Sequence, residues 1–429
     1  VMTYENALEK IHSLLSFGSR PGLDRILSLL DRMGNPQDKL KYIHVAGTNG
    51  KGSTCAMLSS VLVASGYKTG LFISPYITDF RERIQINNEM ISKETLADAV
   101  EETFPLIEKL QSEGIIITEF EYVNALEFYI HAKENCDIVV LETGMGGLLD
   151  CTNVIKPPLC SVITTIGLDH TAILGDTIEK IAAQKCGIIK SGSVAVTSEQ
   201  AENAMIVIEQ TAEKLNVPLV KSESVNIEVN SETLEGSEFE YNGRKIHINL
   251  AGNHQLENAK TALAAIESVR QRGLLNITDD DISVGFSKAE NPARFELLSK
   301  NPVVILDGAH NPNGIEAFKN AVRNFLDGER ITCVMGMLAD KDIDSSIKLL
   351  DGVFETVYTV PVDNPRAISS KELAQKCKGY FKSVTSFDSA EKAFDGAFED
   401  AEKNGGVVVI CGSLYLAGEI RPYILEKVK

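Results

Sequence analysis

Short apolar runs alternate with longer helical patterns along most of the chain. In the first half, four runs have the length and continuous apolar character of buried strands. They span residues 42–47 (YIHVAG), 69–74 (TGLFIS), 137–142 (DIVVLE) and 160–167 (CSVITTIG). Helical periodicity covers residues 53–66, closed by Gly66, and residues 118–135. This alternation predicts a parallel sheet with helices on both faces.

The pattern changes over residues 219–250, where polar and apolar positions alternate. Asn242-Gly243 in this stretch is typical of a hairpin turn, so we expect a small antiparallel flap on the first domain. Helical texture returns over residues 253–269. The polar stretch 287–296 (SKAENPARFE) then predicts a domain boundary.

Beyond this boundary a second alternation of strands and helices begins. Its strand-like runs span residues 302–307, 331–337, 356–362, 383–387 and 406–413. They predict a second, smaller parallel α/β domain. We therefore expect an α/β fold in two domains, residues 1–292 and residues 293–429.

Composition narrows the possible partners. The formal net charge of −18 argues against nucleic-acid and anionic-membrane partners, which need a cationic surface, but leaves small anionic ligands open. The eight cysteines form no CxxC pair, so we expect no structural zinc and a reducing cytoplasm. We see no signal peptide and no apolar stretch long enough to span a bilayer. A monomer is the default expectation.

The segment GTNGKGS, residues 47–53, departs from the usual phosphate-loop pattern. Only Thr48 and Asn49 separate Gly47 from Gly50, and the hydroxyl residues come one place later than usual after Lys51. The order of strand, Gly-rich turn, Lys and helix still favours phosphate binding over a tight turn with an exposed lysine.

Polar residues follow other strands of the first domain. Glu142 ends a buried apolar run, where a carboxylate is costly without a cation or donors, and we favour it as a magnesium ligand. Asp169 and His170 follow the fourth strand, where His170 is as consistent with a structural histidine as with a site residue. Ser74-Pro75 alone indicates a plain turn.

Lys185 falls on the apolar face of a helical pattern. Ile178, Ile181 and Ala182 precede it at helical spacing, so its side chain is predicted to point inward, where desolvation favours the neutral amine. A neutral amine can react with carbon dioxide to form a carbamate. A lysine that reaches the surface, or one that interacts with the helix C-terminus, fits the pattern equally well.

The second domain offers candidates of its own. Asp307 and His310 lie just past a predicted strand end, and Ser413 follows the last strand. Arg294, in the boundary segment, could reach a triphosphate bound between the domains or form an interdomain salt bridge.

Together these segments resemble the folylpolyglutamate synthase and dihydrofolate synthase family, which is related to the Mur peptide ligases. The resemblance covers essentially the whole chain. It rests on GTNGKGS, SPYITDFRERI, TEFE, ETGMGGLLDCTN, GLDH, EKIAAQKCGIIK, NPARFE, DGAHNP, GMLADKD and CGSLYLAG, in this order. It implies a P-loop ATPase-type N-terminal domain, a Rossmann-like C-terminal domain and an active site between them.

The resemblance also implies roles for individual residues. ATP phosphates would be held by Thr48, Asn49, Gly50, Lys51, Gly52 and Ser53, with further ATP contacts from Asn258, Arg294 and Asp307. Two magnesium ions, and a monovalent cation such as K⁺, are expected, with Ser74, Glu142, His170 and a carbamylated Lys185 as metal ligands. Lys51, Lys185, His170, Asp307 and His310 are the expected catalytic residues.

The folate side of the site would be lined by Arg83, Thr118, Glu119, Phe120, Glu121, Leu149, Asp150 and Cys151. His310 and Ser413 are candidates for the incoming glutamate or the acyl phosphate. This chain departs from the family at Arg81, Leu148 and Cys151, where Asn, Arg and a small residue are common. These departures affect substrate contacts more than the ATP site.

The implied reaction is ATP-dependent ligation of L-glutamate to a reduced folate through an acyl phosphate. Dihydropteroate as an additional substrate is left open. A Mur-type ligase for cell-wall precursors is the first alternative, but the loop at residue 47 leaves little room for its usual N-terminal domain. A non-catalytic nucleotide-binding protein is the second alternative.

Overall fold

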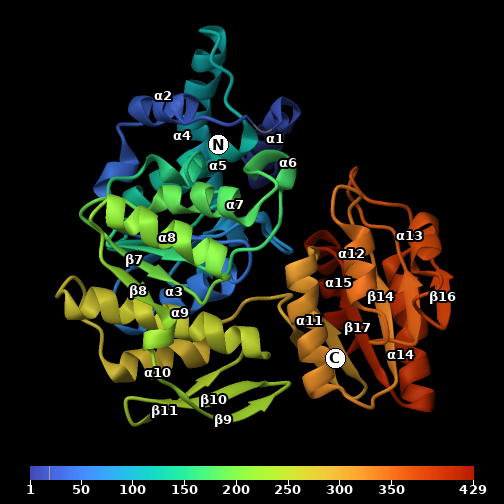
Figure 1. The fold of residues 1–429 in the computed structure, drawn as a ribbon. Coiled ribbons are helices and arrows are strands. Elements are labelled where there is room, and N and C mark those ends of the chain that lie inside the picture. The colour runs from blue at the N-terminus through green and yellow to red at the C-terminus, as the bar shows by residue number, and fades with distance from the viewer. Residues whose placement is uncertain (19) are drawn as a thin grey trace.

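The computed structural model describes residues 1–18 and 20–429. Figure 1 shows a larger N-terminal domain, coloured blue to yellow, beside a smaller C-terminal domain in orange and red. Each domain is built on its own sheet, as the two alternating patterns predicted. None of the helices in the described ranges combines the length and apolar character needed to cross a bilayer.

The N-terminal domain is built on an eight-stranded sheet with the order β4-β3-β2-β5-β1-β6-β7-β8. The strands are β1 Tyr42–Ala46, β2 Thr69–Phe72, β3 Ile84–Ile86, β4 Glu89–Met90, β5 Ile138–Glu142, β6 Cys160–Ile163, β7 Val194–Thr197 and β8 Leu219–Lys221. From β2 to β8 all pairings are parallel, while β3 and β4 form an antiparallel edge. The central strands are continuous apolar runs because helices cover both of their faces.

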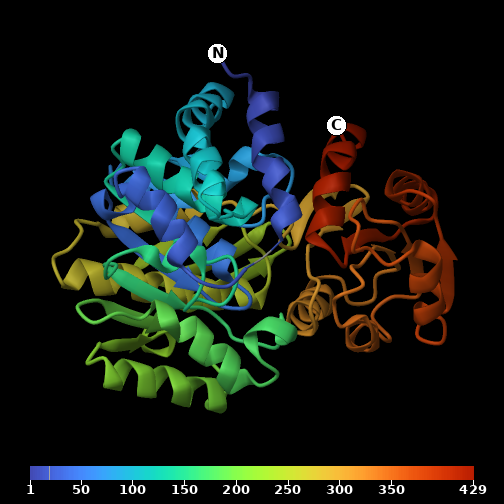
Figure 2. The ribbon, with the colours of Figure 1, turned by 90° about the horizontal axis from the view of Figure 1, so that it is seen from above.

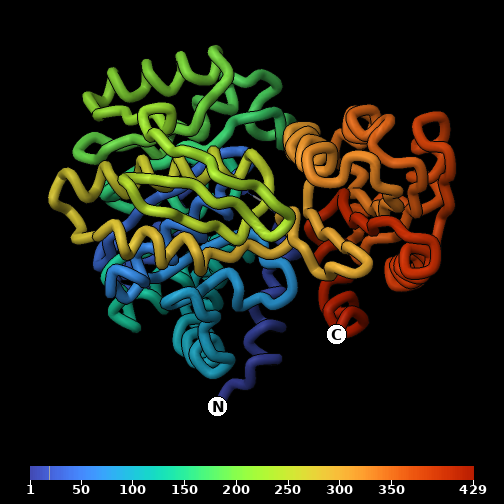
Figure 3. The backbone as a smooth tube through the Cα atoms, turned by 90° about the horizontal axis from the view of Figure 1, so that it is seen from below, coloured from blue at the N-terminus to red at the C-terminus, as the bar shows by residue number. Residues whose placement is uncertain are grey.

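The expected antiparallel flap begins later than the alternation suggested. Leu219–Lys221 is β8, which pairs parallel with β7, so this part of the prediction was wrong. The separate antiparallel sheet contains β9 Glu228–Thr233, β10 Gly236–Tyr241 and β11 Arg244–Ile248, and it lies in front in Figure 3. Its hairpin turns at Asn242 and Gly243, whose φ angles of 51° and 72° match the predicted turn. β8 has only three residues, all half-buried, so the local sequence carries no sign of its pairing direction.

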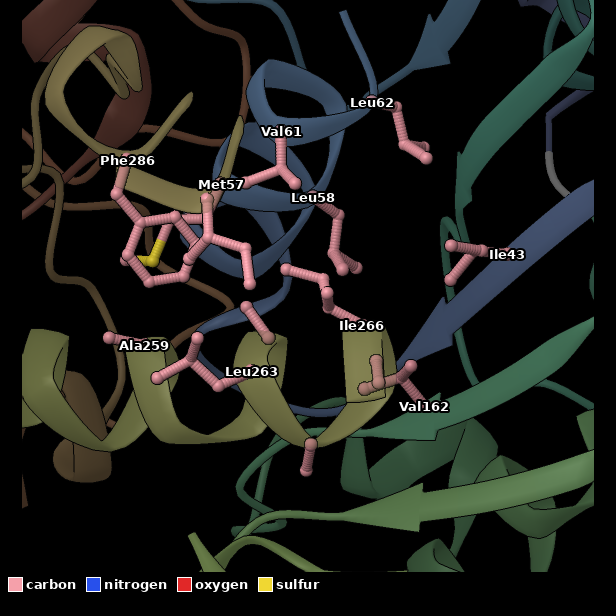
Figure 4. Close-up of a cluster of buried hydrophobic side chains, with 14 of the residues drawn as sticks. Ile43, Met57, Leu58, Val61, Leu62, Val162, Ala259, Leu263, Ile266 and Phe286 are labelled. Atoms are coloured by element: carbon pink, nitrogen blue, oxygen red, sulfur yellow. The ribbon is translucent and has the colours of Figure 1, made fainter. Parts of the chain in front are cut away.

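The N-terminal domain contains ten helices in its described residues. They are α1 Tyr4–Ser13, α2 Asp24–Arg32, α3 Lys51–Ala64, α4 Lys93–Ser112, α5 Glu119–Lys133, α6 Thr171–Leu174, α7 Ile178–Lys185, α8 Glu202–Lys214, α9 Asn253–Gln271 and α10 Asp279–Lys288. α3 follows the Gly-rich loop, and Met57 and Val61 of this helix pack near Leu263 of α9 and Phe286 of α10 (Figure 4). Each such buried side chain contributes about 1.5–3 kcal/mol, so the loop rests on a rigid support.

The C-terminal domain is a six-stranded sheet with the order β12-β13-β17-β14-β15-β16. Its elements are β12 Glu296–Lys300, β13 Val303–Leu306, α11 Pro312–Phe325, β14 Ile331–Met335, α12 Ile343–Leu349, β15 Thr356–Thr359, α13 Ser370–Cys377, β16 Ser383–Ser386, α14 Ala390–Asn404, β17 Val407–Cys411 and α15 Leu414–Lys427. The sheet is parallel except for β12, which pairs antiparallel with β13. Sequence analysis missed β12 because its five residues are only partly buried and lack a continuous apolar run.

The two domains meet through polar contacts and one close backbone approach. Figures 1 and 2 show α11 and α15 on the side of the C-terminal domain that faces the larger domain. Lys341 Nζ lies 3.0 Å from Asp169 Oδ1 across the interface. A Cβ atom on Gly418 of α15 would lie 1.8 Å from the carbonyl oxygen of Ile77, so only glycine permits this approach.

Gly418→Ala should therefore push α15 away from the N-terminal domain and lower turnover by about 10- to 100-fold, because small displacements of reacting groups are costly. The matched control is Gly396→Ala in α14, where the nearest atom to the new Cβ would be 3.9 Å away. Alanine favours a helix by about 0.5–1 kcal/mol, so Gly396→Ala should not unfold more easily, whereas the clash in Gly418→Ala should lower stability by about 1–3 kcal/mol. The measurements are steady-state ADP formation and thermal unfolding. Equal activity of the two variants would contradict this role for the interface.

Candidate active site

The Gly-rich loop joins the end of β1 to the start of α3. Gly50 is the N-cap of α3, has φ of 86° and contributes no side-chain cap, so the first amides of the helix are available to an anion. A Cβ atom on Gly50 would lie 2.3 Å from Asn258 Oδ1, which explains the glycine. Lys51 Nζ curls back and donates to the carbonyl oxygen of Gly47 at 3.1 Å. This arrangement can hold phosphate groups.

Glu142 at the end of β5 faces the same loop. Its carboxylate is buried and accepts a hydrogen bond from the amide of Ser74 at 3.0 Å, beside the cis peptide bond between Ser74 and Pro75. Burial raises the pKa of Glu142, while Lys51 and Arg294 oppose that shift. A buried carboxylate next to a hydroxyl residue fits Mg²⁺, which takes only one or two protein oxygens when phosphates and water supply the rest.

No cluster of three or more His, Cys, Asp or Glu side chains suited to a metal ion occurs in the part of the chain that the structure describes. His170, the N-cap of α6, lines the same cavity and has φ of 50°. Burial lowers the pKa of His170 against the effect of Asp169, which favours the neutral imidazole that a metal ligand requires.

Lys185 points inward, as the helical pattern predicted. It is 4% exposed and packs with Ile181 and Ala182 on the buried face of α7. Its Nζ donates to the carbonyl oxygen of Gly47 at 2.8 Å, so it lies directly under the Gly-rich loop. Burial, with a further contribution from Lys51, lowers the pKa of Lys185 to about 7. A substantial fraction of the amine is therefore neutral at physiological pH.

The C-terminal domain supplies the opposite wall of this cavity. Asp307 accepts hydrogen bonds from the amides of Phe295 at 2.8 Å and Ala309 at 2.6 Å, and burial raises its pKa to about 6 against the effect of Arg294. Arg294 lines the cavity. Its two neighbours in the chain, Ala293 and Phe295, have positive φ angles of 59° and 48°. This uncommon backbone conformation lies at the junction between the domains.

His310 Nδ1 lies 2.8 Å from the carbonyl oxygen of Gly308. Because a carbonyl only accepts, Nδ1 carries the proton and Nε2 is left free to accept. Burial lowers the pKa of His310 to about 4, with Lys341 adding to the shift, so the ring is neutral at pH 7. Such a ring can take a proton from an attacking amine.

We distinguish two connected cavities. The phosphate-loop cavity is lined by Gly47, Thr48, Asn49, Gly50, Lys51, Gly52, Ser53, Ser74, Glu142, His170, Lys185, Asn258, Arg294, Asp307 and His310, among others. All of the residues predicted to bind ATP or metal are therefore brought together. The outer cavity continues from it and shares His310, His170 and Ser74.

The predicted folate-side residues divide into two groups. Those that line the outer cavity are Arg83, Phe120, Leu149, Asp150, Cys151, His310 and Ser413. Thr118, Glu119 and Glu121 do not line it. The side chains of Thr118 and Glu121 instead form a capping box at the start of α5, and Glu121 also pairs with Arg25 at 2.8 Å. TEFE is a capping-box sequence, which is a signal that could have separated these residues from Phe120.

The side chains of Asp150 and Ser413 also accept hydrogen bonds from backbone amides. The Asp150 carboxylate accepts from the amides of Gly144 at 3.0 Å and Met145 at 2.8 Å and so shapes the turn after β5. Ser413 Oγ caps α15 by accepting from the amide of Tyr415 at 3.1 Å. Both residues therefore support the cavity wall, whatever else they bind.

Sequence analysis placed Asp169 at a strand end without a role and missed its partners Lys341 and Asn311, which join the two domains at the cavities. Asp169 accepts hydrogen bonds from Lys341 Nζ at 3.0 Å and from Asn311 Nδ2 at 2.9 Å. Burial would raise the pKa of Asp169, but His170, Lys341 and His310 outweigh it and hold the pKa well below its usual range. Lys341 lies in the segment GMLADKD just past β14, so its place at a strand end was the available signal.

Known proteins match this arrangement along the whole chain. The family model of the Mur ligase middle domain matches residues 45–266, and that of the Mur ligase, glutamate ligase domain matches residues 293–414. The chain is 38% identical to the dihydrofolate synthase/folylpolyglutamate synthase of Bacillus subtilis, over 97% of this chain and 98% of that protein. It is 36% identical to the folylpolyglutamate synthase of Lacticaseibacillus casei, over 99% of both chains.

Solved structures give the same relationship. A folylpolyglutamate synthase from Mycobacterium tuberculosis, complexed with ADP and AMPPCP, superposes with a TM-score of 0.89 at 30% identity, covering 98% of this chain and 99% of that one. An FPGS–AMPPCP–folate complex superposes with a TM-score of 0.86 at 33% identity, covering 99% of this chain and 100% of that one.

Proposed function

Because the chain belongs to the folylpolyglutamate synthase and dihydrofolate synthase family of Mur ligases, we propose that it joins L-glutamate to a reduced folate with the hydrolysis of ATP. The observation that carries this proposal is the convergence of the Gly-rich loop, Glu142 and Lys185 on one cavity that opens into a second, more apolar one. The first cavity would take the triphosphate, and the second would take a ring system with a carboxylate tail.

The reaction begins with attack of the substrate carboxylate on the γ-phosphate, which gives an acyl phosphate and ADP. Carboxylate and triphosphate repel each other, so the site must supply positive charge. Lys51 and Arg294 line the cavity from opposite domains and would offset this repulsion and stabilise the transferring phosphoryl group. When bound, Mg²⁺ supplies Lewis-acid stabilisation of the phosphate oxygens, and Ser74, Glu142 and His170 would hold it.

The second step is attack of the α-amine of glutamate on the acyl carbon, with phosphate as the leaving group. His310 lines both cavities and its neutral ring has Nε2 free to accept, so it would take the proton from the amine. An acyl phosphate is lost in open water, so the contacts between α11, α15 and the N-terminal domain would protect it. The low pKa of Lys185 supports carbamylation of this residue, which would add a negative ligand beside the loop.

Some finer expectations belong to the same proposal. We propose a domain division between residues 292 and 293, a monovalent cation such as K⁺ as an additional cofactor, and a monomeric enzyme. All eight cysteines are buried and free, which supports a reducing cytoplasm as its place of action. We propose dihydropteroate as an additional substrate because the name of the Bacillus subtilis relative includes dihydrofolate synthase.

The test is a phosphate-release assay with tetrahydrofolate and dihydropteroate offered separately, each with and without L-glutamate. We expect glutamate-dependent phosphate release with tetrahydrofolate and formation of an amide product seen by mass spectrometry. Turnover with a nucleotide-linked muramyl peptide instead would favour the Mur-type alternative. ATP binding without turnover on any acceptor would favour a nucleotide-binding protein that is not an enzyme.

A further inference from the structure

Ser53 lies in the first turn of α3 and lines the phosphate-loop cavity together with Lys51 and Gly52. Its side chain is 3% exposed, and its Oγ accepts a hydrogen bond from the side-chain amide of Asn291 at 2.9 Å. Asn291 comes from the segment between α10 and β12, 238 residues further along the chain. One hydrogen bond therefore joins the start of α3 to the connection between the two domains.

The direction of this hydrogen bond determines what the Ser53 hydroxyl can still bind. An amide N–H only donates, so the bond uses a lone pair of the Ser53 oxygen and leaves the hydroxyl proton for another acceptor. In the described ranges of the chain, Ser53 Oγ makes no second side-chain hydrogen bond. Because Ser53 lines the cavity, its proton is available to a ligand there, and a phosphate oxygen is a strong acceptor.

The segment that carries Asn291 is held in place by the C-terminal domain. Two residues after Asn291, the carbonyl oxygen of Ala293 accepts from the amide of Gly308 at 2.8 Å. The segment also packs closely against the loop, since a Cβ atom on Gly52 would lie 3.2 Å from Asn291 Nδ2. The amide that reaches Ser53 is therefore a fixed donor rather than a mobile surface group.

Asn291 itself stays behind the wall of the site. It is half-buried, and within the described residues it lines neither the phosphate-loop cavity nor the outer cavity. A ligand in the first cavity would thus meet Ser53 but not Asn291. Any effect of the Asn291 side chain on that ligand has to pass through a residue that it contacts.

We infer that Asn291 is a positioning residue for phosphoryl transfer, whose amide turns the hydroxyl proton of Ser53 toward a bound phosphate. This inference rests on the proposed function. A serine hydroxyl without such a partner rotates among several staggered positions, and only some of them direct its proton into the cavity. A donor that is already oriented stabilises developing charge without the cost of reorganisation.

The test is a double-mutant cycle on kcat/KM for ATP with Asn291→Ala, Ser53→Ala and the double variant. We expect Asn291→Ala to lower kcat/KM for ATP about tenfold, the loss that corresponds to about one hydrogen bond. Because Asn291 acts through Ser53, the double variant should lie within about twofold of Ser53→Ala. The KM values for the folate substrate and for L-glutamate should stay within about twofold of the wild type, which a general disturbance of the fold would not allow.

Asn291→Asp tests the direction of the hydrogen bond with almost no change of shape. A carboxylate only accepts, so the Ser53 hydroxyl would turn its proton toward the new carboxylate and away from the phosphate. The added negative charge would also repel the phosphate. The value of kcat/KM for ATP should therefore fall about 30-fold, which is more than in Asn291→Ala.

The matched control is Asn88→Asp. Asn88 Nδ2 donates to Ser60 Oγ at 3.2 Å, so it makes the same kind of contact with the same helix, but neither residue lines either cavity in the described part of the chain. Asn88 has φ of 64°, which aspartate also tolerates. This variant should keep kcat/KM for ATP within about twofold of the wild type.

Three results would overturn the inference. They are additive losses in the cycle, a rise in KM shared by all three substrates, and a loss in Asn88→Asp as large as that in Asn291→Asp. Calorimetric titration of the same variants with a non-hydrolysable ATP analogue separates this inference from the proposed function. Wild-type protein that binds the analogue but never forms an amide would contradict the function, while the cycle in dissociation constants would still decide the role of Asn291.

Discussion

Lys185→Ala should lower the rate of ADP formation by about 10²- to 10³-fold, the size of effect seen when one preorganised electrostatic group is removed. The reason is its position, with Nζ 2.8 Å from the Gly47 carbonyl oxygen beneath the loop that would hold the phosphates. Added bicarbonate should not restore the activity of the variant, because no amine remains to form a carbamate. The measurement is single-turnover ADP formation at saturating ATP.

The lysine chemistry itself can be followed without turnover. With a pKa of about 7, the neutral amine of Lys185 rises from about one tenth at pH 6 to about nine tenths at pH 8. A carbamate signal from ¹³C-bicarbonate in the NMR spectrum should therefore grow over this range in the wild type and be missing in Lys185→Ala. A wild-type spectrum without this signal, or a variant with near-normal turnover, would refute the carbamate role.

The same lysine should affect stability in a predictable direction. The pKa of Lys185 is about 7 in the folded protein against 10.5 for an unperturbed lysine, so between these values the unfolded chain binds the proton more tightly. The contribution of Lys185 therefore makes the free energy of unfolding rise as pH increases from about 7 to about 10.5. Lys185→Met should lose this rise relative to the wild type in denaturant titrations.

Lys190→Met is the matched control for these experiments. Lys190 lies five residues further along the chain, and burial lowers its pKa to about 8, but it lines neither cavity in the described ranges. Its Nζ contacts the backbone carbonyl oxygen of Asn153 at 3.5 Å instead. Replacement should change stability and leave turnover within about twofold of the wild type.

Glu142→Gln should lower turnover by a similar 10²- to 10³-fold and weaken the response of nucleotide binding to Mg²⁺. Glutamine keeps the shape of the side chain and can still accept from the amide of Ser74, so the fold should survive. The charge that would attract the cation is lost. Calorimetric titration with an ATP analogue, with and without Mg²⁺, measures this directly.

Glu127→Gln provides the comparison for Glu142→Gln. Glu127 is also a buried carboxylate whose pKa is raised by burial, but it pairs with His131 Nδ1 at 2.8 Å and lines neither cavity in the described part of the chain. Its replacement should lower thermal stability without changing the magnesium response. If Glu142→Gln kept the full magnesium response of the wild type, the metal-ligand role would be wrong.

Much of the fold follows from periodicity that the chain carries locally. Continuous apolar runs between helical patterns predicted the parallel core of both sheets, since only strands covered on both faces are apolar throughout. Helical spacing likewise placed Lys185 among buried residues. The edges were harder to predict. β8 and β12 are short and half-buried, and their pairing depends on neighbours distant in sequence.

The candidate site was likewise predictable where it depends on local sequence and unpredictable where it depends on contacts between distant residues. Residues at the carboxyl ends of strands, such as Glu142 and Asp307, could be predicted because parallel sheets gather their strand ends at one edge. Thr118 and Glu121 were predicted on the folate side, and the structure has them in a capping box outside the outer cavity, because a capping box and a binding motif share the same residue types. The position at a strand end indicated candidates, but it could not predict which of their side chains form hydrogen bonds with backbone amides.

By itself, the sequence determined that this protein has two α/β domains and a phosphate-type loop on the first of them, because the period and order of its residues are local properties. The tertiary structure alone decided what lies across the cleft from that loop. Lys341 meets Asp169 and Arg366 faces the outer cavity only because two separately folded domains pack together. No periodic pattern records that packing, since it depends on the shapes of surfaces formed by residues far apart in the chain.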